Sequence, residues 1–375
     1  MRVRRLDTTR ARDVRTFIRF PFRLYRDCPQ WVPPLLPAMR LALNRNRYPF
    51  YRFSDADFFV VESAGQVVGR IAVLENRPYN EYQGTKAAFF YYFEVVEDVR
   101  VARLLFDTAF EWAQKRGLDV MYGPKGLLRA DGHGALVEGF EHRPAVGLPY
   151  NHAYYDAFIR DSGFVKEIDY LSGYLSAAEY QLPQRVHDIA ERIKARRGFS
   201  VRTFTSKMEL RQLAPVVHKI YEEAFVQVWG YYPVSEDEIK VLIERIVSIA
   251  DPRLIKLVTK GDEAIGFVFA YPDVSEAIQR IKGRVWPFGW IQLMLEIKRT
   301  KWVNFNGVGV VPKYQGVGAN ALLYSELAKT LTSNDSQFEH GDYVQVAERN
   351  LESLGDAKVL DFPIYKRHRV YRKGL

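Results

Sequence analysis

The sequence predicts an α/β protein with two similar halves, each a mixed, mostly antiparallel sheet flanked by helices. Strand-like and helix-like segments alternate along its 375 residues, and their order in the first half returns in the second. Hydrophobic residues make up 47% of the chain, the usual share for a globular protein, so each half can bury a core. At roughly 150 residues per domain, the length also suits two folding units.

The first half is expected to begin its sheet with a hairpin over residues 56–74. There ADFFVVES and VVGRIAVL are rich in β-branched and aromatic residues, and AGQ makes the turn. Residues 86–96, KAAFFYYFEVV, predict a third strand. Apolar residues at helical spacing predict a helix over 98–116, and a short strand over 120–122 follows. After an irregular stretch, residues 154–175 predict a short helix and paired strands.

The second half repeats this order with an offset of 197 residues, which makes Gly69 and Gly266 equivalent. The predicted counterparts are strands at 254–259, 264–271, 302–311 and 343–347, with a helix at 318–331. Between the halves, apolar residues at helical spacing and a basic end, KARR, indicate a connecting helix. The chain therefore divides into a domain over 1–176, a connecting helix over 177–199 and a domain over 200–375.

Composition excludes several classes of protein. The single cysteine, Cys28, rules out an intrachain disulfide and any zinc site with two thiolates, and it favours a cytoplasmic location. The N-terminal residues lack the apolar stretch of a secretory signal, and nowhere do eighteen apolar residues run together, so no membrane span is expected. Residues 285–297, VWPFGWIQLMLEI, are expected to form a packed helix, with an interfacial or partner-binding helix as the alternative.

The most informative segment is residues 306–323, NGVGVVPKYQGVGANALL. A β-branched strand ends at Val311, a glycine-containing turn follows, and a good helix begins at Ala319. Glycines at positions 316 and 318 let a ligand approach the backbone N–H groups at the positive end of a helix. Such a turn suits a diphosphate. The spacing is neither that of a P-loop nor that of a dinucleotide-binding Gly-x-Gly-x-x-Gly turn.

This strand, turn and helix resembles the acetyl-CoA loop of the GCN5-related N-acetyltransferases (GNATs). The family pattern is Gln or Arg, two residues, Gly, one residue, then Gly or Ala; here it reads Gln315-x-x-Gly318-x-Asn320, with Asn320 in place of Gly or Ala. More narrowly, the whole chain resembles a group of bacterial proteins with two such domains in tandem. The segments that carry this likeness are FPFRLYRDCPQWVPPLL, LVEGFEHRPAVGLPYNHAYYDAF and GRVWPFGWIQLML.

The resemblance implies that the second domain binds acetyl-CoA or another acyl-CoA. Two groups of residues would contact it: Val308, Gly309 and Val310 pair with the pantetheine arm, and Gln315, Gly316, Val317, Gly318, Ala319 and Asn320 wrap the diphosphate. Asn350 resembles the family's asparagine that opens the next helix, or is simply its N-cap. The equivalent segment of the first domain, EVVEDVRVARLL, has Glu94, Glu97 and Asp98 and no glycine, so that domain is predicted to have lost the cofactor.

Acetyl transfer to an amine needs help with proton transfer. A primary ammonium with a pKa near 10.4 is mostly protonated at pH 7, and releasing the free amine costs about 4.6 kcal/mol. Glu348 is the predicted base, with His340 or a water chain as less favoured alternatives, and Tyr365 is the predicted acid by family geometry. A backbone N–H of residues 308–310 would stabilise the oxyanion.

Other features have a plainer interpretation. His133, His142 and His152 lack the spacing of a metal site and are expected to be surface loop histidines, so no metal is predicted. The aromatic run 89–93 is expected in the core. The segment 366–373, KRHRVYRK, is predicted to be an edge strand with a basic outer surface. Two interpretations stay open for three aromatic residues, which either line an acceptor pocket or only pack in the core: Trp229, Tyr231 and Tyr232.

The sequence thus predicts an acyl-CoA-dependent N-acyltransferase with a small-molecule amine or peptide as acceptor. Two alternatives stay open. The first is a non-catalytic protein that senses CoA or docks a partner on the same scaffold. The second, less favoured because a net charge of +9 is mild for this length, is a nucleic-acid binder.

Overall fold

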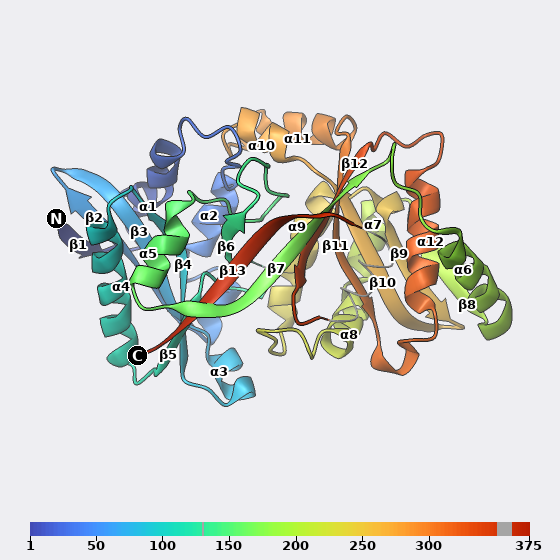
Figure 1. Ribbon diagram of the computed structural model, residues 1–375, viewed down its shortest axis with the longest axis horizontal. Coiled ribbons are helices and arrows are strands. Elements are labelled where there is room, and N and C mark those ends of the chain that lie inside the picture. The colour runs from blue at the N-terminus through green and yellow to red at the C-terminus, as the bar shows by residue number, and fades with distance from the viewer. Residues whose placement is uncertain (130, 351–361) are drawn as a thin grey trace.

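The computed structural model describes residues 1–129, 131–350 and 362–375 (Figure 1). The elements of the first half are β1 (Arg2–Arg5), α1 (Ala11–Leu24), α2 (Leu36–Ala42), η1 (Pro49–Arg52), β2 (Asp55–Ser63), β3 (Gln66–Glu75), α3 (Arg77–Gln83), β4 (Ala87–Val95), α4 (Val99–Gln114), β5 (Val120–Gly123), β6 (Ala135–Glu138), α5 (Tyr154–Asp161) and β7 (Val165–Ser176).

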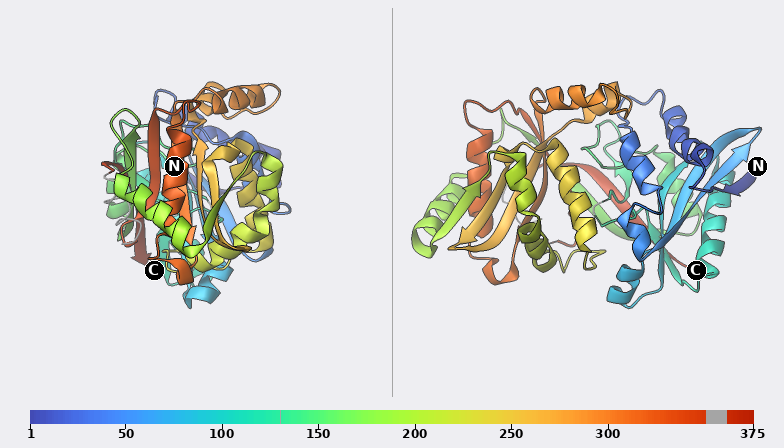
Figure 2. Two further views of the ribbon diagram at one scale, coloured as in Figure 1. Left: turned by 90° about the vertical axis from the view of Figure 1, so that its right-hand side faces the viewer. Right: turned by 180° about the vertical axis from the view of Figure 1, so that it is seen from behind.

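The second half supplies helices on both faces of its strands (Figure 2). Its elements are α6 (Gln184–Arg197), β8 (Phe199–Thr203), α7 (Lys207–Gln212), α8 (Ala214–Ala224), α9 (Glu236–Ile249), η2 (Pro252–Leu254), β9 (Ile255–Lys260), β10 (Glu263–Pro272), α10 (Ser275–Arg280), α11 (Gly289–Ile297), β11 (Trp302–Val310), η3 (Pro312–Tyr314), α12 (Ala319–Leu331), β12 (His340–Ala347) and β13 (Ile364–Gly374).

One sheet runs through both halves, in the order β1-β2-β3-β4-β5-β13-β7-β12-β11-β10-β9-β8. Two neighbouring pairs are parallel, β4 with β5 and β11 with β12, and the others are antiparallel. The predicted α/β class and mixed, mostly antiparallel sheet are therefore confirmed. The repeat is visible in the register, because Gly69 pairs with Val61 and Val95 as Gly266 pairs with Val258 and Val310.

The halves exchange strands at the centre of the sheet. The C-terminal strand β13 returns to the first half and lies between β5 and β7, while β7 pairs on its other side with β12 (Figure 1). Along the chain, α6 lies within the segment 177–199 that is predicted to connect domains at 1–176 and 200–375. The sheet itself crosses the division.

The prediction of an edge strand at residues 366–373 is wrong. β13 is a central strand, and Lys366 and His368 are almost completely buried. The charges are neutralised by distant carboxylates: Lys366 donates to Asp342 over 2.6 Å, and Arg369 donates to Asp169 over 2.7 Å. Nothing local in the sequence reveals these partners, since they come from β12 and β7.

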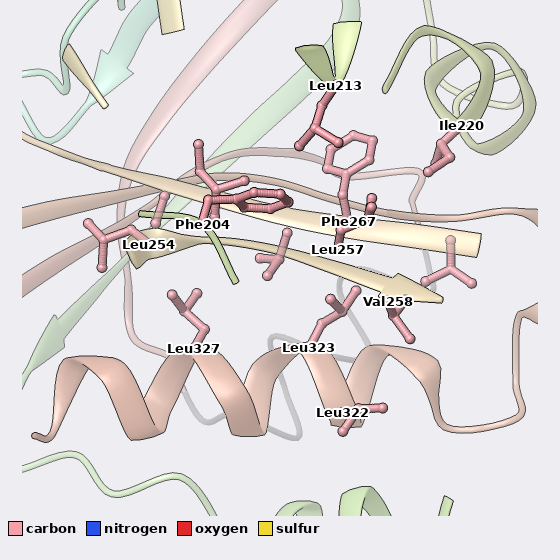
Figure 3. Close-up of a cluster of buried hydrophobic side chains, with 14 of the residues drawn as sticks. Phe204, Leu213, Ile220, Leu254, Leu257, Val258, Phe267, Leu322, Leu323 and Leu327 are labelled. Carbon is pink, nitrogen blue, oxygen red and sulfur yellow. The ribbon is translucent and has the colours of Figure 1, made fainter. Parts of the chain in front are cut away.

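The second half packs its core between the sheet and the helices on its two faces. On one side Leu323 and Leu327 of α12 point toward the strands, and on the other Phe204, Leu213 and Ile220 approach them (Figure 3). The aromatic run 89–93 is in the core as predicted, with Phe89, Phe90 and Phe93 buried. A packed helix at 285–297 was the favoured expectation, and it is wrong: α11 leaves large apolar side chains exposed.

Candidate active site

The parallel strands β11 and β12 separate partway along their length. They pair from Trp302 opposite His340 to Phe305 opposite Tyr343, and beyond that point β11 continues beside β10 while β12 continues beside β7. An irregularity in each strand marks the separation. The register of β11 shifts opposite Phe269 and Ala270 of β10, and the register of β12 against β7 shifts between Tyr343 and Val346. The sheet therefore opens in the middle.

Two backbone positions of β11 face this opening. Gly309 is opposite Phe267, and the N–H of Val311 donates to the carbonyl of Ile265, so these alternate residues bond toward β10. In an antiparallel strand the intervening residues direct their N–H and C=O groups the other way. Val308 and Val310 therefore present their backbone polar groups to the opening.

The glycine-containing turn lies directly after β11 and leads into α12. Gly316 has a φ of +68° and Gly318, the N-cap of α12, a φ of +94°, both in the left-handed region that favours glycine. The Gln315 side chain donates to the carbonyl of Val310 over 3.0 Å and fixes the turn to the end of the strand. A Cβ at Gly318 would lie 2.8 Å from Ile193 of α6, so glycine is also required by packing there.

This turn exposes backbone donors at the positive end of a helix. The N–H groups of Gly316, Val317 and Gly318 have no backbone acceptor within the described ranges, and the first turn of any α-helix leaves its own N–H groups free. A Cβ at Gly316 would have no neighbour within 4 Å, so the backbone at that point is open. The arrangement fits the diphosphate of a CoA ester.

A cavity of about 230 Å³ occupies the opening between β11 and β12. Its walls are mostly apolar, and Asn350 lies on its lining together with residues of α12. The N–H of Asn350 donates to the carbonyl of Ala347 over 2.9 Å, which places this residue in a turn directly after β12. The helix that Asn350 was expected to open would lie outside the described residues.

A second, larger cavity of about 650 Å³ lies between the halves. Its lining combines apolar residues of α8 and α9 with residues of the long loop before α5. The two cavities share lining residues where β11 and β12 separate: Tyr170, Phe225, Val228, Phe269, Asn306, Gly307, Val344 and Gln345. The opening in the sheet thus connects a slot lined by β11, β12 and α12 with a large chamber between the halves.

His133 lies next to this shared region. Its ring packs against Tyr170 at 4.1 Å between centroids, and its carbonyl accepts a hydrogen bond from Gln345 over 3.1 Å. The backbone of Asp131 holds one ring nitrogen, and the buried Nε2 has no partner in the described part of the chain. Burial, together with the nearby charge of Lys125, lowers the pKa of His133 to about 3, so the ring is neutral at pH 7.

Charged groups also line the large cavity, Lys125 and Asp131 among them. Burial lowers the pKa of Lys125 to about 8, and its ammonium lies over the rings of Phe89 and Tyr232. Asp131 is held by Arg245 at 2.6 Å. These groups give one wall of a largely apolar chamber a polar character.

The predicted acid and base lie elsewhere. Glu348 accepts from Lys166 over 2.7 Å and from the N–H of Asp169 over 3.1 Å, and Tyr365 packs among His142, Tyr174 and Lys366. Neither residue lines either cavity. Trp229 does line the large cavity, whereas Tyr231 and Tyr232 are buried.

Sequence reasoning missed His133. It was expected on the surface with His142 and His152, because a lone loop histidine carries no motif, and only the folding of that loop against β7 and β12 buries it. Groups of three His, Cys, Asp or Glu side chains able to hold a metal ion do not occur among the residues that the structure describes.

The first half fills the equivalent opening with its own side chains. Val95 corresponds to Val310. Its N–H donates to the hydroxyl of Tyr155 over 2.9 Å, and its carbonyl accepts from the hydroxyl of Tyr154 over 2.7 Å. The start of α4 is capped by Asp98, whose carboxylate accepts from the N–H of Arg100 over 2.9 Å. A carboxylate at that point repels a phosphate.

Comparisons with known proteins agree with this fold. The structure superposes on a tandem GNAT protein from the clavulanic acid biosynthesis pathway with a TM-score of 0.57 and 14% identity, covering 100% of this chain and 98% of the other. A GCN5-related glucosamine N-acetyltransferase region of a fungal multi-domain β-N-acetylglucosaminidase matches with a TM-score of 0.55 and 12% identity over 99% of this chain and 38% of the other. The chain therefore has the tandem GNAT fold.

Two curated proteins are similar over nearly the whole chain. Bacterial ceramide synthase of Caulobacter vibrioides is 27% identical over 371 residues, 97% of this chain and 95% of its own length. Protein YghO of Escherichia coli is 25% identical over 376 residues, 97% of this chain and 93% of its own length. No protein-family profile matches the sequence.

Proposed function

We propose that this protein is an acyl-CoA-dependent N-acyltransferase that transfers an acyl group to an amine held between its two halves. One observation carries the proposal: the slot lined by β11, β12 and α12 meets the large chamber where β11 and β12 separate. A thioester and an amine that enter from opposite sides can react only at such a junction. The tandem GNAT fold supports the same reaction class.

The donor would be bound by the second half. Val308 and the N–H of Val310 offer backbone groups to the amides of a pantetheine arm, as an added strand would. Gly316, Val317 and Gly318 offer N–H groups to the diphosphate, Gly309 keeps β11 close to α8, and Asn350 borders the slot. The closed opening of the first half supports a single acyl-CoA site in the chain.

The acceptor would carry a long aliphatic chain. The chamber of about 650 Å³ is lined mainly by apolar residues, those of α8 and α9 among them, which suits hydrocarbon better than a polar amine such as an aminoglycoside. The similarity to a protein named bacterial ceramide synthase agrees with a lipid amine. We therefore propose a long-chain amino alcohol as the acceptor class.

His133 would receive the proton of the amine. The amine nitrogen attacks the thioester carbonyl, the C–N bond forms, and the nitrogen gains positive charge, becomes more acidic than a free ammonium and must release a proton. The bare Nε2 of His133 can then take its proton, after which the C–S bond breaks and the thiolate leaves with a proton from solvent. A positive charge on Lys125 disfavours the ammonium form of the acceptor. Glu348 and Tyr365 stay predictions from the sequence for the base and the acid.

Two measurements test this function. Calorimetry with acetyl-CoA and palmitoyl-CoA should show binding at one site per chain. A thiol-release assay with sphinganine, spermidine and a lysine peptide should then show CoA release, fastest with sphinganine. Failure to bind either thioester would overturn the proposal. Binding without release for any of the amines would leave a CoA sensor instead.

A further inference from the structure

A band of exposed apolar side chains lies along α11 and the residues before it. Trp286 is 81% exposed and Phe288 72%, and they continue into Trp290, Ile291, Met294 and Leu295, each of which is also exposed. We call these six residues the 286–295 patch. On α11 the four members are spaced at i, i+1, i+4 and i+5, so they share one face of the helix.

This face points away from the protein. The opposite side of α11 carries the buried carboxylate of Glu296, which pairs with Arg280 of α10. α10 and α11 lie along one edge of the molecule and stand clear of the sheet (Figures 1 and 2). The usual polarity of a surface helix is therefore inverted, since its apolar face meets solvent.

Basic side chains surround the patch. Lys282, Arg284, Lys298, Arg299 and Lys301 are all exposed, and the only acidic residue between positions 282 and 301 is the buried Glu296. Of the five, only Lys301 has an ion-pair partner within the described residues, Glu339. Aromatic and aliphatic side chains flanked by cations match the boundary between the head groups and the acyl chains of an anionic bilayer.

We propose that the 286–295 patch docks the protein onto an anionic membrane surface. None of the described helices has the length and apolar character needed to cross a bilayer, so the contact would be peripheral. Hydrogen bonds also link the segment next to the patch to the wall of the large chamber. Gln279 donates to the carbonyl of Trp31 over 3.0 Å and Leu36 donates to the carbonyl of Gly283 over 2.8 Å, and residues 31–35 line the large chamber.

Vesicle flotation tests the proposal without any substrate, so its result does not depend on the acyltransferase activity. The full-length protein should float with vesicles of equimolar phosphatidylcholine and phosphatidylglycerol, and less with phosphatidylcholine alone. The combined variant Trp286→Ser, Phe288→Ser and Met294→Ser should lose at least tenfold in partitioning. Lys298→Gln with Arg299→Gln should lose about fivefold per charge removed, on anionic vesicles only.

A matched control uses two exposed apolar residues outside the patch, Phe53→Ser with Met208→Ser, which are 56% and 69% exposed in the native chain. This variant should float like the native protein, and unchanged urea midpoints confirm that every variant folds. The proposal is overturned if the native protein does not float at low salt, or if the patch variant floats equally well. It is also overturned if the native chain is a dimer that the patch variant turns into monomers without any vesicle binding.

Discussion

At the scale of single residues, the proposed function depends most on one unpartnered nitrogen. Because His133 lines the large chamber and its Nε2 has no partner in the described part of the chain, His133→Ala should reduce kcat about 100-fold or more while the Kd for acyl-CoA stays unchanged. His142→Ala, at a partly exposed loop histidine of the same region, should leave both quantities unchanged. Stopped-assay kinetics and calorimetry measure the two. A normal kcat for His133→Ala, with a reduced one for Glu348→Gln, would return the role of base to Glu348.

Asp169 makes a residue-scale prediction for acid stability. Burial alone would raise its pKa, but hydrogen bonds from Arg369 and Lys166 outweigh burial and lower the pKa to about 2. A lowered pKa stabilises the folded state above the unfolded pKa near 3.9, and this contribution disappears as the pH falls toward 2. Asp169→Asn should therefore cost about 2 kcal/mol at pH 7 and much less at pH 2.5.

Urea unfolding at several pH values measures this difference. Asp161→Asn, on the exposed end of α5, is the control and should show no such pH dependence. A constant difference for Asp169→Asn across the pH range would show that lost packing, rather than the ion pairs between β7 and β13, explains its effect.

At the scale of elements, the turn before α12 can be tested with a closely matched control. Gly316→Asp adds a carboxylate beside the free N–H groups, and its Cβ meets nothing within 4 Å, so only left-handed strain is added to the charge. We expect the Kd for acyl-CoA to rise at least tenfold because the carboxylate repels the diphosphate. Gly261→Asp, also left-handed and open, carries the same strain in the β9–β10 turn and should not change the Kd. If the two variants bind acyl-CoA with equal affinity, the turn does not bind the diphosphate.

The sequence predicts the elements of this turn well because the signals are local. A β-branched strand, two glycines and a helix start lie within eighteen residues, and the structure has the strand, the left-handed glycines and α12 in that order. The connecting helix and the aromatic core strand are predicted from equally local signals. The burial of His133 and the central position of β13 depend on contacts more than 200 residues apart in the chain, which no sequence pattern marks.

At the scale of the whole molecule, strand exchange ties the two halves into one body. β13 returns to the first half and β7 joins the second, so the walls of the chamber between them are fixed by one continuous sheet. The buried pair of Lys366 and Asp342, at 2.6 Å, joins β13 to β12 across the same boundary. We therefore expect the proposed acceptor to have a limited chain length.

The rate should therefore rise with the chain length of the amine and then stop rising when the chamber is full. Burial of each added CH₂ contributes about 0.8 kcal/mol of binding free energy, which corresponds to about fourfold in kcat/KM. Ile246→Phe on α9 narrows the lining and should shift the best acceptor to a shorter chain, whereas Val241→Phe, on the same helix but outside the lining, should not. A series of amino alcohols of increasing length measures the optimum. If the optimum is the same for Ile246→Phe and the native protein, the aliphatic chain binds outside the chamber, and the acceptor site must be sought on another face.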